Sequence, residues 1–105
     1  MKKIQSLKSF LAECRRLVRK GYKVKLVEGR IRLKPPNGKK YCRCPITAVC
    51  ENLGGGLFVL RDVYLAAEAM HLSNELSDRV MNATDCLDIY QKIRKKLLAV
   101  FGLKD

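Results

Sequence analysis

The residues best suited to metal or covalent chemistry are three thiols close together in the chain, Cys42, Cys44 and Cys50. With the single histidine, His71, or with Cys86, they could supply the four ligands of a zinc site. Structural zinc sites usually pair their cysteines as C-x2-C, however, and this chain has one C-x-C. Because free cysteines are among the most often buried residues, we expect buried thiols, no metal and no other cofactor.

Cys44 could instead act as a nucleophile. It follows Arg43 and precedes Pro45 at the expected start of a helix, and a cation and a helix N-terminus both stabilise a thiolate. A nucleophile also needs a base and a site for the oxyanion, and only His71 could be a histidine base. We therefore expect Cys44 to be a helix cap or a buried side chain, and the protein not to be an enzyme.

Neither the acidic residues nor the glycines form a catalytic motif. Glu75 with Asp78, and Asp85 with Asp88, stand near expected helix starts, where negative charge favours the helix dipole. The run 54–56 of three glycines lacks the Lys-Ser or Lys-Thr pair of a phosphate-binding loop and predicts a flexible turn.

The most informative pattern lies in residues 22–34, where apolar residues alternate with cations on both sides of Glu28-Gly29. Such alternation is typical of a β-hairpin. A loop of two or four residues pairs Leu26 with Ile31 and gathers the apolar side chains on one face, whereas a three-residue loop mixes the faces. Glu-Gly is not the favoured Asn-Gly pair of two-residue turns, so the loop length stays open.

This register places Lys25 opposite Arg32 and Lys23 opposite Lys34. Like charges directly opposite each other destabilise a strand pair. A bound polyanion, most plausibly nucleic acid, would relieve the repulsion. The alternatives are a solvated basic face that keeps the strand edges from aggregating and a docking surface for an acidic protein.

The net charge of +12 is distributed unevenly along the 105 residues. Residues 1–43 hold 15 basic and 2 acidic residues, residues 44–91 hold 2 and 7, and residues 92–105 hold 5 and 1. The N-terminal half therefore predicts a positive face that the last helix extends. Aromatic residues make up only 7% of the chain, so we expect phosphate contacts to dominate over base stacking.

From these patterns we expect a small non-enzymatic module that binds DNA or RNA through phosphate contacts. The expected site comprises Arg15, Arg19, Lys23, Lys25, Arg30, Arg32, Lys34, Lys39 and Lys40. Cations of the last helix extend it, namely Lys92, Lys95 and Lys96. The alternative is a protein-interaction module: an adaptor or inhibitor whose basic face meets an acidic partner, or a homodimer that associates through an apolar strip of the C-terminal helices.

A helix-turn-helix unit is a second candidate for DNA binding, with its turn at residues 71–73. The apolar positions of such a unit would be Ala66, Ala67, Met70, Leu72 and Val80. Its second helix would present Glu75 and Asp78 to phosphate, which is unfavourable. We therefore expect an ordinary helical corner there.

Several elements must position these side chains. Apolar residues at helical spacing predict a first helix at about residues 3–20, ended by Gly21. After the hairpin and the turn at residues 35–38, residues 39–43 are a candidate third strand. A short helix is expected from Cys44-Pro45 to residues 54–56.

From Leu57 onward the pattern is helical to the end. We expect one helix from Val63 to Leu72, one from a cap at Ser73 or Asn74 to about Ala83, and a last helix from Cys86 to Phe101. The last helix has Thr84 or Asp85 as its candidate cap and ends at Gly102.

The fold class is therefore α+β in a single domain, residues 1–105. An N-terminal helix and a small antiparallel hairpin or three-stranded sheet occupy residues 1–43, and a cluster of about four helices occupies residues 44–105. The apolar fraction of 48% suffices for one core, which should be aliphatic because tryptophan is absent.

We expect a cytoplasmic protein without membrane attachment. The longest apolar runs fall far short of the roughly 20 residues that span a bilayer. Lys8 interrupts any apolar stretch near the N-terminus, so residues 1–20 are interpreted as a mature helix and not a targeting segment. An odd number of cysteines, five, argues against a disulfide framework and for reduced thiols.

Overall fold

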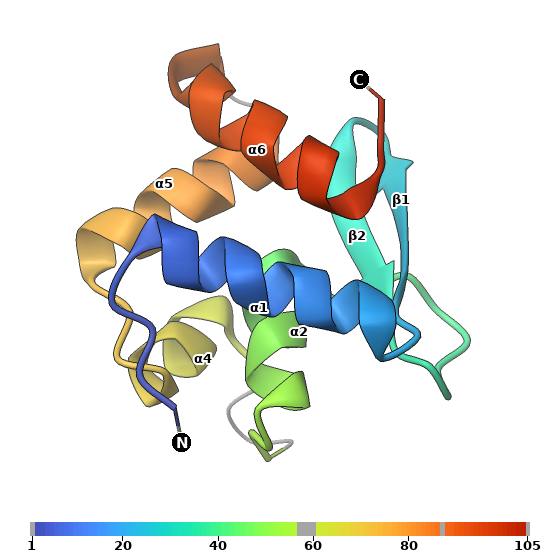
Figure 1. The fold of residues 1–105 in the computed structure, drawn as a ribbon, viewed down its shortest axis with the longest axis horizontal. Helices are drawn as coiled ribbons and strands as arrows, with labels where there is room; N and C mark the ends of the chain where they lie inside the picture. The colour runs from blue at the N-terminus through green and yellow to red at the C-terminus, as the bar shows by residue number, and fades with distance from the viewer. Residues whose placement is uncertain (1, 57–60, 87, 105) are drawn as a thin grey trace.

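A computed structural model of the protein describes residues 2–56, 61–86 and 88–104 (Figure 1). In chain order the elements are α1 (Leu7–Arg19), β1 (Lys23–Val27), β2 (Arg30–Lys34), α2 (Pro45–Asn52), α4 (Val63–Ala69), α5 (Asn74–Thr84), the short 3-10 helix η1 (Asp88–Tyr90) and α6 (Gln91–Phe101). The predicted α+β fold, with an N-terminal helix, an antiparallel hairpin and a group of C-terminal helices, is confirmed.

Helix α1 begins and ends at local signals in the sequence. The Ser6 hydroxyl accepts a hydrogen bond from the Ser9 N–H at 3.1 Å, so the helix starts later than predicted. At the other end, Gly21 has a φ of +100° and its N–H donates to the Val18 carbonyl. The Tyr22 N–H donates to the Leu17 carbonyl, which completes a Schellman motif and turns the chain into the hairpin.

Strands β1 and β2 pair in the predicted register, with Leu26 opposite Ile31. The loop has two residues, Glu28 and Gly29, with φ values of +53° and +81°. Both values are positive, as a type I′ turn requires, so the question of loop length is answered without the usual Asn-Gly pair. The Cys86 sulfur packs closely against this turn. A Cβ on Gly29 would lie 2.7 Å from that sulfur, so the turn has no room for a side chain there.

The predicted third strand at residues 39–43 is wrong. Only Arg43 pairs with β2, where it exchanges two backbone hydrogen bonds with Leu33, at 2.8 and 3.0 Å. Pro35 directly after β2 has no N–H to donate, and the turn from Pro35 to Gly38 leads the chain away. Pro45 then starts α2 two residues beyond Arg43, which leaves no length for further pairing.

Among the C-terminal helices, the predicted Ser73 cap is confirmed, because its hydroxyl accepts the Leu76 N–H at 3.1 Å. The predicted start of the last helix at Cys86 is wrong. Cys86 has a φ of +72°, which does not fit a helix, and α6 begins only at Gln91. Its predicted end at Gly102, with a φ of +69°, is confirmed. The residues 57–60 and 87, expected to be helical, lie outside the described residues.

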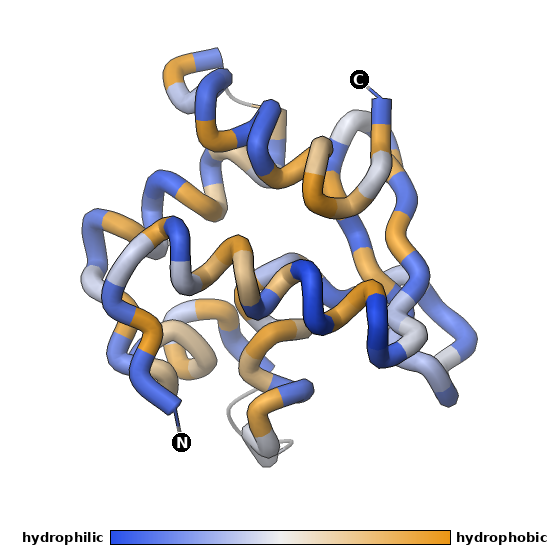
Figure 2. Tube along the Cα trace, in the orientation of Figure 1, coloured by the Kyte–Doolittle hydropathy of each residue, from blue (hydrophilic) through white to orange (hydrophobic). Residues whose placement is uncertain are grey.

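The core is mainly aliphatic and joins all the main elements. Figure 2 shows apolar positions recurring between hydrophilic ones along α1 and α6. Fully buried members include Phe10 and Leu17 of α1, Ile31 of β2, Val49 of α2 and Leu97 of α6. The hairpin therefore turns its apolar face to the helices and its cationic face outward. None of the described helices has the length and apolar character needed to cross a bilayer.

Two charged side chains, which the sequence patterns gave no reason to place inside, are almost fully buried. Arg94 of α6, 1% exposed, donates to the Gly29 carbonyl at 2.7 Å and to the Ala83 carbonyl at 2.9 Å. It thereby joins the hairpin turn to the end of α5. Glu13 of α1 is equally buried and forms salt bridges with Lys2, at 2.7 Å, and with Arg16.

Candidate nucleic-acid interface

The outer face of the hairpin carries two cross-strand pairs of cations. The register places Lys25 opposite Arg32 and Lys23 opposite Lys34, as expected from the sequence. Both lysines of β1 are exposed, and their partners on β2 are half-buried. Arg30, at the start of β2, is exposed on the same strand. We refer to the outward side chains Lys23, Lys25, Arg30, Arg32 and Lys34 as the hairpin face.

An aromatic ring lies among these cations. The Lys25 ammonium is 4.2 Å from the centre of the Tyr41 ring, and the Lys34 ammonium is 5.6 Å from it. Tyr41 reaches this position because the Arg43 bridge to Leu33 folds its segment back along β2. Cation–π attraction offsets part of the repulsion between the two lysines. In the sequence, the signal for Tyr41 is its position directly after the cations Lys39 and Lys40.

Arg32 differs from the lysines because it has a carboxylate partner. Its Nη2 lies 3.2 Å from Asp85 Oδ1 at the end of α5, and its side chain is only 21% exposed. The two residues are 53 positions apart, so the pairing depends on how α5 packs against the hairpin. Arg32 is therefore less available to an external anion than Lys23 or Lys25.

A network of hydrogen-bonded side chains connects the base of the hairpin to α2. The Tyr22 hydroxyl donates to Glu51 Oε1 at 2.8 Å, and Arg43 Nη2 lies 3.1 Å from Glu51 Oε2. Burial, and then the hydrogen bond to Glu51, raise the pKa of Tyr22. The tyrosine therefore stays a neutral donor, and Glu51 neutralises Arg43.

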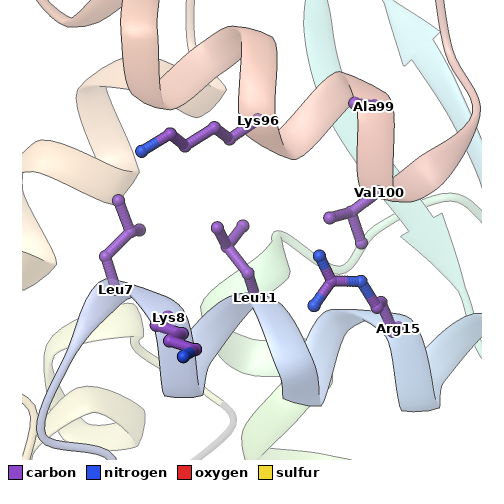
Figure 3. A pocket seen from close by; sticks show the side chains of 7 residues that line it. All are labelled: Leu7, Lys8, Leu11, Arg15, Lys96, Ala99 and Val100. Carbon is purple, nitrogen blue, oxygen red and sulfur yellow. The ribbon is translucent and has the colours of Figure 1, made fainter.

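The remaining predicted cations are dispersed. Lys39 and Lys40 are exposed on the segment after β2, and Arg19 is exposed in the last turn of α1. Arg15 lies elsewhere, in a groove between α1 and α6 that also contains Lys96 (Figure 3). Lys92 and Lys95 are exposed on α6, and Lys92 lines a hollow beside η1. The predicted site is thus divided between the hairpin and the α1–α6 side of the molecule.

The cysteines and the histidine lie in different settings. Cys44 caps α2, with its sulfur 3.5 Å from the Thr47 N–H and its own N–H donating to Thr47 Oγ1 at 3.0 Å, so the predicted cap is confirmed. Cys50 is buried, which raises its pKa, whereas Cys42 is exposed. His71 lies in the turn before α5. Within residues 2–56, 61–86 and 88–104, no three His, Cys, Asp or Glu side chains gather as metal ligands.

The segment considered as a helix-turn-helix is a helical corner with an acidic exterior. All five of its predicted apolar positions are buried: Ala66, Ala67, Met70, Leu72 and Val80. Glu75 and Asp78 are exposed on α5, and Glu75 pairs with Arg79 at 2.5 Å. The exposed carboxylates of Glu75 and Asp78 are unfavourable for contact with phosphate.

The chain matches no protein-family model, no curated protein and no solved structure. The side chains themselves must therefore indicate the ligand. The hairpin face and Tyr41 combine a high density of cations with one aromatic ring, and the Asp85 carboxylate pairs with Arg32.

Proposed function

We propose that the protein is a non-enzymatic module that binds nucleic acid through phosphate contacts, with the hairpin face as its principal surface. The observation that carries the proposal is the pairing of cation with cation at two consecutive outward positions of the ladder. Cross-strand like charges cost stability, and a protein selected for stability alone would place opposite charges or threonines there. A bound polyanion offsets this cost.

The arrangement suits an extended anion better than a single small one. Lys23 and Lys25 form one row and Arg30, Arg32 and Lys34 form the other, with alternate residues of a strand about 6.7 Å apart. Two parallel rows can follow a phosphate backbone or enter a groove of a duplex. The exposed Lys39 and Lys40 lie on the segment that follows β2 and extend the cationic surface.

Tyr41 adds a small contribution that does not depend on base identity. Its ring is half-buried and flanked by Lys25 and Lys34, so at most one base can stack on its exposed part. Because phosphate contacts carry no sequence information, we expect weak sequence preference and a strong dependence of affinity on salt.

The test is fluorescence anisotropy with labelled single- and double-stranded DNA and RNA across a series of salt concentrations. We expect binding with a steep slope of log K against log[salt]. The variant Lys25→Gln/Lys34→Gln should reduce that slope by about 1.4 to 1.8, because each of the two lost phosphate contacts accounts for roughly 0.7 to 0.9.

The matched control is Lys3→Gln/Lys8→Gln, which removes the same charge from the other end of the molecule. Lys3 adjoins Ile4, whose N–H donates to the Met70 carbonyl at 2.9 Å, and Lys8 is near the start of α1. This variant should keep the slope of the wild type. Absence of binding near physiological salt, or equal losses in the two variants, would contradict the proposal.

A further inference from the structure

A groove with a volume of about 720 Å³ runs between α1 and α6 (Figure 3). Its apolar lining consists of Leu7, Leu11, Ala99 and Val100. In Figure 3 the side chains of Leu7 and Leu11 point from α1 toward α6, and Val100 points from α6 toward α1. The groove therefore has an apolar floor formed by two helices, into which the apolar side chains of a third helix can pack.

Cations flank this floor on both helices. Lys8 and Arg15 line the groove from α1, and Lys96 lines it from α6. No acidic residue is among the lining residues, and within the described part of the chain these three cations form no salt bridge. The charges of the groove are therefore free to meet an external carboxylate.

The spacing on α1 matches that of a helix which pairs with another helix. Leu7 and Leu11 are four residues apart, and Val18, which is 45% exposed, follows Leu11 after seven. Lys8 and Arg15 are also seven residues apart, or about 10.5 Å along the axis. A row of apolar positions with a flanking row of charges is the pattern by which coiled-coil helices choose partners.

We propose that the α1–α6 groove binds an acidic amphipathic helix of a partner protein. Apolar side chains of that helix would enter between Leu7, Leu11 and Val100. Carboxylates two turns apart would pair with Lys8 and Arg15 on one side, and a further carboxylate would pair with Lys96 on the other. Charge complementarity sets the orientation and raises the association rate, while the apolar contacts limit dissociation. This function is separate from phosphate binding at the hairpin.

Other occupants fit these features less well. A second copy of the chain also carries a net charge of +12, which opposes self-association. Phosphate gains nothing from an apolar floor. A fatty acid brings one carboxylate, which can pair with Lys8 or with Arg15 but not with both, because two helical turns separate them.

The test uses a synthetic peptide of about 20 residues, long enough to hold a helix in water. Leucines occupy one face, and glutamates spaced seven residues apart flank them; a second peptide has lysines in place of the glutamates. By calorimetry, we expect the glutamate peptide to bind the wild-type protein at least tenfold more tightly than the lysine peptide.

The variant Lys8→Glu/Lys96→Glu should reverse this preference, losing roughly tenfold for the glutamate peptide and gaining affinity for the lysine peptide. The control Lys23→Glu/Lys25→Glu changes the net charge equally on the hairpin and should keep the preference of the wild type. The milder Lys8→Gln/Lys96→Gln provides the same comparison if circular dichroism finds the reversed variant unfolded, with an expected loss of about threefold.

Three results would overturn the proposal. Equal affinity for the two peptides would leave no role for the groove cations. Equal losses of affinity for the glutamate peptide in the hairpin and groove variants would show that only net charge matters. Displacement of the glutamate peptide by a single-chain fatty acid would assign the groove to a small amphiphile.

Discussion

The hairpin face and the α1–α6 groove are both cationic, but their charges have different surroundings. On the hairpin, five cations share one side of a two-stranded sheet whose apolar side chains face the core. Two of them contact Tyr41 and one pairs with Asp85. In the groove, three cations without an ionic partner among the described residues surround four apolar side chains.

Cation density and apolar surroundings, more than net charge, distinguish the ligand classes that we propose for the two surfaces. Dense rows of charge without an apolar floor favour a polyanion, which brings many charges and releases its counterions. Sparse charge around an apolar floor favours a segment with both acidic and apolar side chains, because neither contribution alone is large there. Four sets of variants test this contrast.

The largest expected effect concerns Arg94, the buried side chain that joins the hairpin turn to the helices. Arg94→Met removes the guanidinium donor from the carbonyls of Gly29 and Ala83 in a buried site, and only the Cys86 thiol still donates to the Gly29 carbonyl among the described contacts. We expect the free energy of unfolding to fall by about 3 kcal/mol. Urea denaturation measures the change, and Arg94→Lys, which retains one donor group, should lose less. An unchanged urea midpoint for Arg94→Met would show that the Arg94 hydrogen bonds do not stabilise the fold.

The next effect separates the two surfaces at constant net charge. Lys23→Glu/Lys25→Glu should weaken oligonucleotide binding about a hundredfold, because two phosphate contacts become two repulsions. Lys8→Glu/Lys96→Glu should weaken it only about threefold, through the longer-range field. Anisotropy at one fixed salt concentration measures both. Similar losses would mean that the hairpin face has no special role.

A smaller effect should have the opposite sign. Asp85→Asn removes the carboxylate 3.2 Å from Arg32 and frees that cation for phosphate. We expect oligonucleotide affinity to rise roughly threefold, while stability falls by less than about 1 kcal/mol because the pair is partly exposed. The same anisotropy assay measures the gain. A decrease in affinity would show that the Asp85 pair positions Arg32 for binding and does not mask it.

The smallest effect concerns Tyr41. The contact of its ring with Lys25 at 4.2 Å is partly exposed and should be worth about 0.5 kcal/mol. A double-mutant cycle with Tyr41→Leu and Lys25→Met, read by urea unfolding, measures the coupling between the two side chains. If no coupling is measured, the Tyr41 ring does not offset the repulsion between the cations of the hairpin face. The hairpin face would then differ from the groove even more strongly in unrelieved charge.

Features governed by neighbouring residues could be predicted from the sequence. Alternation in residues 22–34 allows one register that keeps Leu26 and Ile31 on the core side, since a shift by one residue would expose them. Gly21 and Ser73 act within a few residues of the helix ends that they define. The cationic nature of the hairpin face followed directly from that register.

Features governed by distant contacts could not be predicted. The late start of α6 reflects the positive φ of Cys86, whose sulfur donates to the Gly29 carbonyl across the fold. The pairing of Arg32 with Asp85 depends on the same packing of α5 against the hairpin. The groove combines Leu7 and Lys96 from opposite ends of the chain, so its composition becomes evident only when α1 and α6 lie side by side.

The measurement that tests the two-surface account most directly is an NMR titration of isotope-labelled protein, first with a short oligonucleotide and then with the glutamate peptide. We expect the oligonucleotide to shift backbone signals of residues 23–34 and 39–41, and the peptide to shift those of residues 7–18 and 96–100. Two separate sets of shifted residues would support the assignment of one ligand class to each surface. Shifts from both ligands on the same residues, or oligonucleotide shifts confined to the groove, would contradict it.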